Sequence, residues 1–301
     1  MTRFRIIAAI LSLWIAAPAP AAAPVQATAA TLARADGSEI LYYVERRAAR
    51  GRQPLLIMLQ GSGCDSVTLN DRIRWMAPLL APGHALLTIE KYGVATGADG
   101  NDCPADFWRG NTLTQRVLDA AHVVAALRRQ GWWNGRLVIF GGSEGGAVAA
   151  LAAPLIPETR AVIVWSSGIG LPVGAMIRSA LPPAMIAEAD RVFAEARANP
   201  AAGRHWSGAG YRWWADAIDQ IPARGLIQTP APVLLIHGTR DESAPVASAR
   251  AARDLAAAAR KANFTYREYA GYDHFMVDAQ GVDHRRDVVA AAAAWLRRQR
   301  R

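Results

Sequence analysis

A serine surrounded by glycines is the residue of this sequence best suited to nucleophilic chemistry. Ser143 lies in Gly-Gly-Ser-Glu-Gly-Gly at 141–146, after an apolar run at 137–140 and before small residues typical of a helix. This strand–turn–helix context predicts a nucleophile elbow, a sharp turn that holds the hydroxyl above a sheet. Only residues with little or no side chain fit two positions either side of the serine, because these neighbours must pack against one another. The alternative is a phosphate-binding turn, but no lysine follows the glycines and Glu144 is negatively charged.

The serine needs a base, because a serine hydroxyl is a weak nucleophile. In a doubly wound sheet, the groups that can meet lie in loops beyond the carboxyl ends of the strands. His274 follows the last predicted strand, at 264–269, and is therefore the best candidate for the base. His205 lies in a segment of different pattern and is not excluded.

A carboxylate must orient the base and fix its tautomer. Asp241 lies a few residues beyond the predicted strand at 233–236 and is the best candidate, with Glu242 beside it as the alternative. Asp273 adjoins His274, but neighbouring side chains in an extended loop point apart. Taken alone, Asp241 is better explained as an acid stabilised near a helix N-terminus, and it is the combination with the elbow and His274 that favours the catalytic role.

The tetrahedral intermediate of an acyl transfer also needs backbone donors for its oxyanion. One should be the N–H of Glu144, the residue after the nucleophile. The other should come from Gln60-Gly61-Ser62-Gly63, which directly follows a predicted strand at 55–59. The N–H of Ser62 is the predicted donor, and the carboxylate of Glu144 should point away from the oxyanion that it would repel.

The N-terminus has the pattern of a targeting segment. Arg3 and Arg5 precede an apolar run at 6–17 and a small-residue stretch at 18–23. We predict a signal peptide at 1–23, and the apolar run is too short to span a bilayer. A periplasmic or secreted protein without a stable membrane anchor is therefore expected, with a retained N-terminal anchor helix as the alternative.

Two cysteines, Cys64 and Cys103, fall in predicted loops. In an oxidising compartment such a pair predicts one disulfide, and two unpaired thiols are the alternative. A bridge would tie the oxyanion loop to the loop after the next strand. It would stabilise the fold by roughly 3–4 kcal/mol in the chain-entropy model, and we expect it to hold the oxyanion donors still.

Length and composition predict one sizeable core and no nucleic-acid partner. The chain has 301 residues, of which 52% are hydrophobic and 20% are charged. The formal net charge is +9, and 32 of the 34 basic residues are arginine. Aromatic residues do not alternate with the basic clusters, as they would in a nucleic-acid groove.

Strand-like apolar runs alternate with helical patterns along the chain. Strands are predicted at 31–35, 39–45, 55–59, 85–89, 137–140, 161–165, 233–236 and 264–269, and helices at 70–80, 112–130, 144–153, from about 245 and from about 283. Such alternation is typical of a parallel sheet covered on both faces. We therefore predict a single α/β domain over residues 24–301 with a mostly parallel, doubly wound sheet.

The alternation stops between 168 and 230, where helical patterns occur without strands. We interpret this segment as a helical cap inserted over the sheet, because no linker of disordered composition flanks it. Trp206, Trp213 and Trp214 lie in it. They are equally well explained as core residues and as the wall of a substrate cavity.

On these residues the sequence resembles the α/β-hydrolase superfamily over about residues 55–296. The doubled glycines around Ser143 resemble those of the prolyl-oligopeptidase-like and dienelactone-hydrolase-like branches. The other motifs that carry the resemblance are Gln60-Gly61-Ser62-Gly63, Gly238-Thr239-Arg240-Asp241 and Asp273-His274-Phe275. The resemblance implies the α/β-hydrolase fold and a triad in the chain order serine, aspartate, histidine. Gln60 stands where many members have a histidine, and the stretch before residue 55 is too short for the β-propeller of the peptidases.

The sequence thus predicts an exported serine hydrolase that cleaves carboxylic esters through an acyl-enzyme on Ser143. It needs no metal and no organic cofactor, and its partner is a small-molecule ester or a short peptide. Two alternatives are a small peptidase or amidase, and a catalytically silent binding protein with the same fold. Arg109 or Arg178 could bind a substrate carboxylate, although each is more readily explained as a surface residue.

Overall fold

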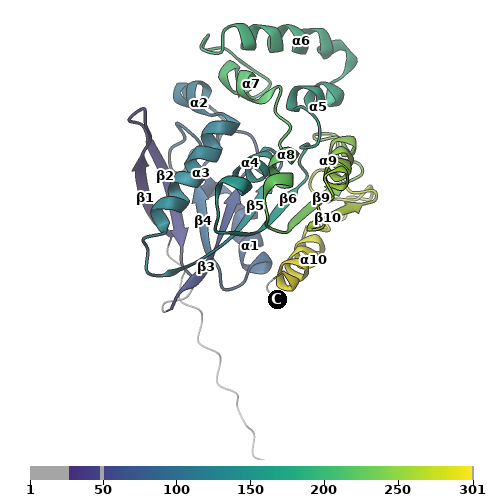
Figure 1. Cartoon of the computed structure of the whole chain (residues 1–301). Helices are drawn as coiled ribbons and strands as arrows, with labels where there is room; N and C mark the ends of the chain where they lie inside the picture. Colours follow the sequence, from purple (N-terminus) through teal and green to yellow (C-terminus); the bar gives the residue numbers. More distant parts are fainter. Residues whose placement is uncertain (1–26, 48–50, 300–301) are drawn as a thin grey trace, which may run out of the picture.

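Eight strands form the central sheet of the computed structural model, which describes residues 27–47 and 51–299 (Figure 1). The strands are β1 (Ala27–Ala33), β2 (Glu39–Glu45), β3 (Gln53–Leu59), β4 (Ala85–Ile89), β5 (Trp133–Gly142), β6 (Thr159–Trp165), β9 (Val233–Gly238) and β10 (Phe264–Tyr269). Their order is β1-β2-β4-β3-β5-β6-β9-β10. β2 alone runs opposite to the other seven strands, so the predicted mostly parallel sheet is confirmed. The predicted signal peptide lies outside the described residues.

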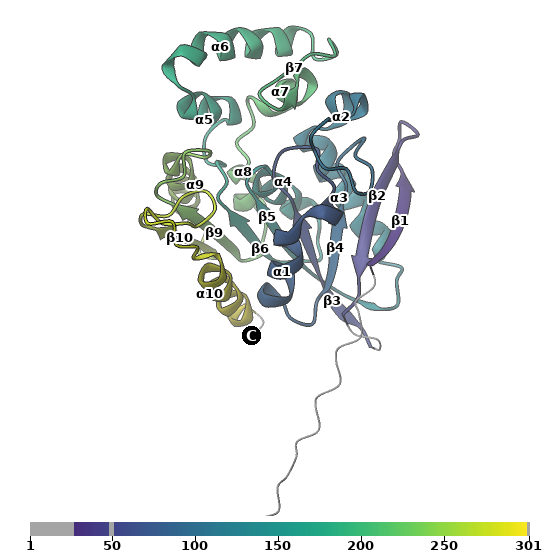
Figure 2. The ribbon, with the colours of Figure 1, turned by 180° about the vertical axis from the view of Figure 1, so that it is seen from behind.

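Helices cover both faces of the sheet because the central strands are apolar on both sides. On one face lie α3 (Leu113–Leu127), α4 (Glu144–Ala152), α8 (Ala223–Gln228) and α9 (Val246–Ala258), and on the other lie α1 (Asp71–Leu80) and α10 (Arg285–Arg298), as Figures 1 and 2 show. Each face has its own cluster of buried apolar side chains. Within the part of the chain that the structure describes, no helix is long and apolar enough to cross a membrane.

The segment between β6 and α8 forms a helical layer above the carboxyl ends of the strands (Figures 1 and 2). It contains α5 (Val173–Ala180), α6 (Pro183–Ala198) and α7 (Tyr211–Ala217). We call residues 168–222 the cap, because α8 lies on the face of the sheet with α4. Its Trp213 and Trp214 belong to the same buried cluster as the face of the sheet below, so the cap is packed onto the sheet.

Three elements differ from the predicted pattern. The first strand begins at Ala27, and α2 (Ala105–Gly110) interrupts the predicted long loop. The cap also contains a two-stranded hairpin, β7 (His205–Trp206) with β8 (Ala209–Gly210). The helix α2 and the two hairpin strands are too short to produce a recognisable apolar period, and the limits of a strand such as β1 are the least predictable feature of a sequence.

Candidate active site

The turn at Ser143 has the strained geometry of a nucleophile elbow. Ser143 joins β5 to α4 with φ 53° and ψ −128°, a conformation that residues with a side chain rarely adopt. A Cβ at Gly141 would lie 2.0 Å from the carbonyl oxygen of Gly145. A Cβ at Gly145 would lie 2.0 Å from that of Leu59. The spacing of the glycines is therefore required by the close approach of β5, α4 and β3.

His274 and Asp241 meet beyond the ends of β10 and β9, although 33 positions separate them in the sequence. The Nδ1 of His274 lies 2.9 Å and 2.8 Å from the two carboxylate oxygens of Asp241. Asp241 is 4% exposed and also accepts a 2.8 Å hydrogen bond from the N–H of Ala244. Since Nδ1 is engaged by the carboxylate, Nε2 is the ring nitrogen that remains for proton transfer.

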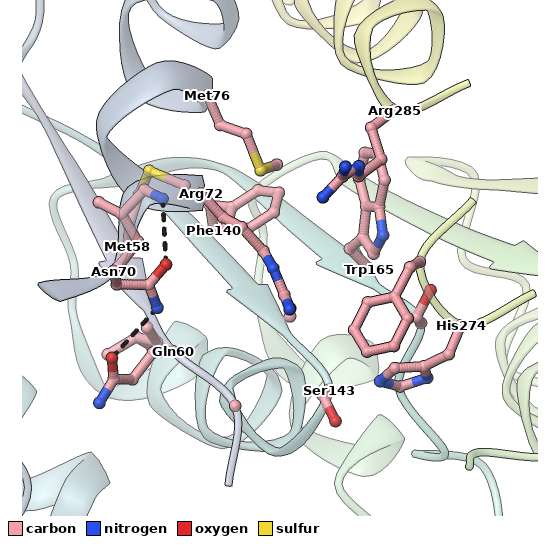
Figure 3. Close-up of a pocket in the computed structure, with 16 residues that line it drawn as sticks. Met58, Gln60, Asn70, Arg72, Met76, Phe140, Ser143, Trp165, His274 and Arg285 are labelled. Carbon is pink, nitrogen blue, oxygen red and sulfur yellow. Dashed lines mark hydrogen bonds between the residues drawn. The ribbon is translucent and has the colours of Figure 1, made fainter. Parts of the chain in front are cut away.

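Ser143 and His274 line one cavity of about 120 Å³ between β5, α1 and the loop after β10. We call it the histidine-side cavity. Figure 3 shows the hydroxyl and the imidazole at the same end of it. Among the described contacts no hydrogen bond joins the two side chains. Such bonds are often long in a free enzyme and shorten when the substrate binds.

The alternative residues lie elsewhere or act differently. Glu242 is exposed and makes no described contact with His274. His205 stacks on Trp108 with ring centroids 4.4 Å apart, at the surface of the cap. His237 is fully buried and contacts the carbonyl of Ala244 at 2.7 Å through Nε2. Burial lowers the pKa of His237, which suits a neutral residue that supports the loop of Asp241.

A second cavity of about 200 Å³ lies on the other side of Ser143, beneath the cap. We call it the cap-side cavity. Trp213 and Trp214 line it and are also buried in the core, so these two tryptophans are core residues that also form the wall of a cavity. Trp206 packs against Trp214 and does not line it. The other lining side chains are mostly small or apolar, and include Leu113, Ala147, Val173, Met176 and Ile177.

Both predicted oxyanion residues, Ser62 and Glu144, line the cap-side cavity together with Ser143. The carboxylate of Glu144 accepts a 2.5 Å hydrogen bond from Arg116 Nη1 on α3. Arg116 Nη2 donates to the carbonyl of Gln60 at 2.6 Å. One buried guanidinium therefore joins the two segments that carry the predicted oxyanion donors.

The far end of the loop after β3 is fixed by a buried lysine. Lys91 Nζ donates to the carbonyl of Gly63 at 2.5 Å. Its pKa is lowered to about 7, first by burial and second by the charge of Arg116. Gln60, in the position where a histidine is common, closes the loop by donating to the carbonyl of Asp65 at 2.7 Å.

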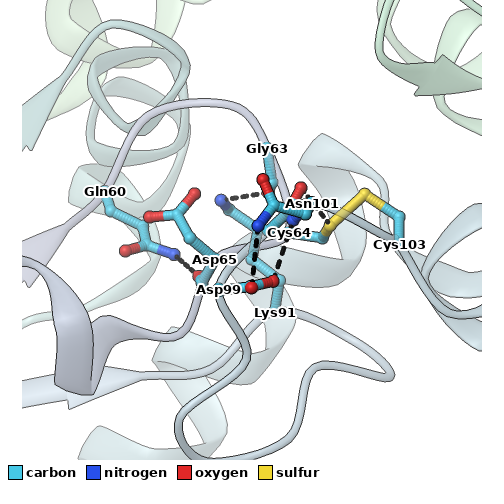
Figure 4. The surroundings of a disulfide bond; sticks show 9 residues. Gln60, Gly63, Cys64, Asp65, Lys91, Asp99, Asn101 and Cys103 are labelled. Carbon is cyan, nitrogen blue, oxygen red and sulfur yellow. Dashed lines mark hydrogen bonds between the residues drawn. A yellow bond between two sulfur atoms is a disulfide. The ribbon is translucent and has the colours of Figure 1, made fainter.

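Cys64 and Cys103 form a disulfide, with an S–S distance of 2.06 Å, at the end of this loop (Figure 4). The bridge links the loop after β3 to the loop after β4, as the pairing predicted. It lies beside Gly63 and Lys91 in the close-up. A small buried cluster with Val94 and Phe107 packs around Cys64.

Four basic residues near the site were not found from the sequence. Arg116 is on the predicted helix after residue 112, but nothing in its spacing distinguishes it from a surface arginine. Lys91 is the second residue after β4 and therefore lies at the carboxyl edge of the sheet, and that position was the available signal. Arg72 and Arg285 line the histidine-side cavity.

The two arginines considered for a substrate carboxylate are paired elsewhere. Arg109 contacts Asp106, and Arg178 contacts Asp190 at 2.8 Å. Both pairs are on the surface, and neither arginine lines a cavity beside Ser143. No group of three or more metal-binding side chains occurs within residues 27–47 and 51–299.

Comparison with known proteins identifies the family. The model of the prolyl oligopeptidase family matches residues 105–300, more than half of the chain and the part that carries Ser143, Asp241 and His274. The chain belongs to the prolyl oligopeptidase family. It is therefore a serine hydrolase. A sequence search of curated proteins found no match.

Solved structures similar to this member of the prolyl oligopeptidase family have the α/β-hydrolase fold, as predicted. The esterase Est1E from Butyrivibrio proteoclasticus with bound ferulic acid matches with TM-score 0.65 and 19% identity, over 88% of this chain and 97% of that one. A protein assigned as a dienelactone hydrolase from Klebsiella pneumoniae matches with TM-score 0.57 and 18% identity, over 92% and 97%. A puromycin-hydrolysing peptidase of Mycobacterium tuberculosis matches with TM-score 0.62 and 19% identity, over 89% of this chain but 38% of that peptidase.

Proposed function

We propose that this protein is an exported serine esterase with the triad Ser143, His274 and Asp241. The observation that carries the proposal is the pairing of His274 with the buried Asp241 at the edge of the cavity that Ser143 lines. The strained backbone of Ser143 supports it, because such strain persists where it presents a reactive group.

In this mechanism Ser143 Oγ attacks the ester carbonyl carbon while His274 Nε2 removes the hydroxyl proton. The carbonyl oxygen becomes an oxyanion that accepts hydrogen bonds from the N–H groups of Ser62 and Glu144. His274 then gives its proton to the leaving alcohol oxygen as the C–O bond breaks. Water repeats the sequence on the acyl-enzyme, releasing the acid and restoring the serine.

The charges of the two cavities favour an ester over a peptide with a free amino terminus. An ammonium group needs a carboxylate partner when it leaves water. Glu144 is the one acidic residue that lines either cavity, and Arg116 already neutralises it. An aminopeptidase is the second candidate, because the family includes peptidases. Neither cavity, however, contains an unpaired acidic residue that could bind the amino terminus of a peptide.

A fluorophosphonate probe tests the serine. The wild-type protein should be labelled and Ser143→Ala should not, whereas Ser243→Ala, a serine that also lines the cap-side cavity, should label normally. An unlabelled wild type would instead support a silent binding protein. Wild-type turnover of p-nitrophenyl butyrate should exceed that of an aminoacyl p-nitroanilide, and the reverse order would favour the peptidase.

Export is supported by the leader pattern at 1–23 and by the disulfide, since such bonds persist in oxidising compartments. Expressed with its full N-terminus in a Gram-negative host, the protein should appear in the periplasm beginning near residue 24. N-terminal sequencing of the fractionated protein checks this, and an intact N-terminus in the membrane fraction would favour the retained anchor.

A further inference from the structure

The histidine-side cavity contains two arginines and no acidic residue. Arg72 comes from α1 and Arg285 from the first turn of α10. Figure 3 shows their guanidinium groups entering the cavity from different sides, above Ser143. Two cations brought together from separate helices, with no acid between them, create a site for an anion.

The charge of these arginines is only partly compensated. Arg285 pairs with Asp283 on the surface, where both side chains are partly exposed (32% and 47%). Arg72 lies over the ring of Phe275, 4.6 Å from its centroid, and has no carboxylate partner among the described residues. The charge of Asp273 also acts on Arg285, so the guanidinium of Arg72 is the cation at this cavity that lacks a carboxylate partner among the described residues.

Gln60 and Asn70 add uncharged polar groups to the wall of this cavity, and most of its other side chains are apolar or aromatic. The apolar and aromatic side chains are Met58, Leu59, Ile73, Met76, Phe140, Trp165 and Phe275. A ligand that fits both features has an apolar or aromatic body and an anionic group at its edge. Ser166 lines both cavities with a buried hydroxyl that has no protein partner in the described structure, which leaves a donor for a polar ligand atom where the two cavities meet.

The position of His274 assigns this cavity to one half of the ester. In the proposed mechanism the imidazole must reach the leaving oxygen to protonate it. His274 lines the histidine-side cavity and does not line the cap-side cavity. The leaving alcohol therefore belongs beside His274, and the acyl chain belongs beneath the tryptophans of the cap.

We infer that the substrates are esters whose leaving alcohol or phenol carries an anionic group, such as a carboxylate, bound by Arg72 and Arg285. This inference rests on the proposed esterase function and adds the substrate class. Arginine is suited to the role because its planar fork binds a carboxylate through two parallel hydrogen bonds.

The test compares two esters of nearly equal shape, 4-butyryloxybenzoate and 4-butyryloxybenzamide, whose leaving phenols differ in charge. In Arg72→Gln and Arg285→Gln, the ratio of kcat/KM for the anionic ester to that for the neutral ester should fall about tenfold relative to wild type. Arg72→Lys, which keeps the positive charge, should recover part of the wild-type ratio. The wild-type ratio should also fall as salt is raised.

The neighbouring arginines provide matched controls. Arg74→Gln on α1 and Arg286→Gln on α10 remove the same charge from residues that do not line the cavity, and should leave the ratio unchanged. If the ratio falls equally in these controls, the effect comes from the general surface charge of the protein, and the inference is wrong.

A second pair of esters tests the assignment of the halves. Monophenyl succinate and phenyl pentanoate differ in charge on the acyl side, and their ratio should not change in Arg72→Gln. If this ratio falls in Arg72→Gln, the placement of the leaving group in the histidine-side cavity is wrong. If the wild type cleaves both benzoic esters and the variants have the wild-type ratio of kcat/KM, the inference about the substrate class is wrong but the esterase function stands. If the wild type cleaves none of the four esters, the esterase function itself is contradicted.

Discussion

At the scale of single residues, the candidate site depends on how each buried charge is compensated. The carboxylate of Asp241 receives the His274 ring and the N–H of Ala244, and lies 3.3 Å from Nε2 of His237. The polar atoms of this buried carboxylate are therefore engaged, as burial of a polar group requires. Glu242, next in sequence, is in water.

Replacing the two acids separately tests this difference. Asp241→Asn should lower kcat by about 10³–10⁴, because an amide cannot hold the tautomer in which Nε2 accepts the serine proton. Glu242→Gln should remain near wild type. Kinetics with p-nitrophenyl butyrate measures both, and a larger loss at Glu242 would overturn the assignment of the acid.

Lys91 should make the stability of the protein depend on pH above neutrality. Its pKa is lowered to about 7 in the folded chain, against about 10.4 when unfolded. Between these values the unfolded chain binds more protons, so the free energy of unfolding should increase as pH rises. Lys91→Met should flatten this increase by up to roughly 1.4 kcal/mol per pH unit.

Urea titrations at several values between pH 7 and about 10 measure the slope. Lys261→Met, at the other lysine of the chain, should change it less because that side chain is only half-buried. Identical slopes in Lys91→Met and wild type would contradict the lowered pKa.

At the scale of elements, the loop after β3 is the part whose geometry the chemistry requires most. Arg116 holds it at the carbonyl of Gln60, Lys91 holds it at Gly63, and the disulfide holds it at Cys64. Three separate elements thus fix a loop of only a few residues. Backbone donors act on a developing oxyanion only when they are held in place before the reaction.

Arg116→Gln should lower kcat by about 10–10² with little change in KM, because the two donor-bearing segments lose their common anchor. Arg116→Lys should recover part of the rate. Arg128→Gln, at the exposed end of the same helix, serves as the control. Since breaking a buried ion pair also destabilises by about 3–5 kcal/mol, circular dichroism must show that the variant is folded, and a raised KM with unchanged kcat would argue against a positioning role.

Removing the disulfide should affect both stability and rate. The bridge closes a loop of 39 residues, for which the chain-entropy model gives about 4 kcal/mol. Cys64→Ser with Cys103→Ser should lower the free energy of unfolding by about this amount and should lower kcat. An unchanged kcat in the folded double variant would show that Arg116 and Lys91 suffice to hold the loop.

At the scale of the whole molecule, the active site is the junction of two layers. The sheet presents Ser143, Asp241 and His274 at one edge, and the cap covers the cap-side cavity above Ser143 (Figure 1). On α7, the carboxylate of Asp216 accepts hydrogen bonds from the N–H and hydroxyl of Thr114, at 3.0 Å and 2.6 Å. This contact ties the cap to the start of α3.

Asp216→Ala should loosen the cap without unfolding the sheet. We expect KM for esters of long acyl chains to rise by about three- to tenfold, as two hydrogen bonds are lost, with a smaller change for acetyl esters. Faster hydrogen exchange in residues 205–217 would locate the motion. Asp190→Ala breaks the exposed pair with Arg178 within the cap, and an equal rise in KM there would contradict the role of the anchor.

The sequence by itself determined the sheet and the identity of the candidate triad. Buried strands require unbroken apolar runs, and the elbow requires glycine at 141 and 145, so both leave local patterns. The rule that parallel strands present their following loops at one edge then selected His274 and Asp241.

Only the tertiary structure decided the surroundings of the site. Arg72, Arg116 and Arg285 are three of 32 arginines, and no local pattern distinguishes an arginine that enters a cavity from one that lies in water. The cap likewise became a cavity wall through contacts between residues far apart in the chain. The charge and shape of a cavity arise from side chains that several elements bring together. They therefore depend on distances in the folded chain, which the order of residues alone does not give.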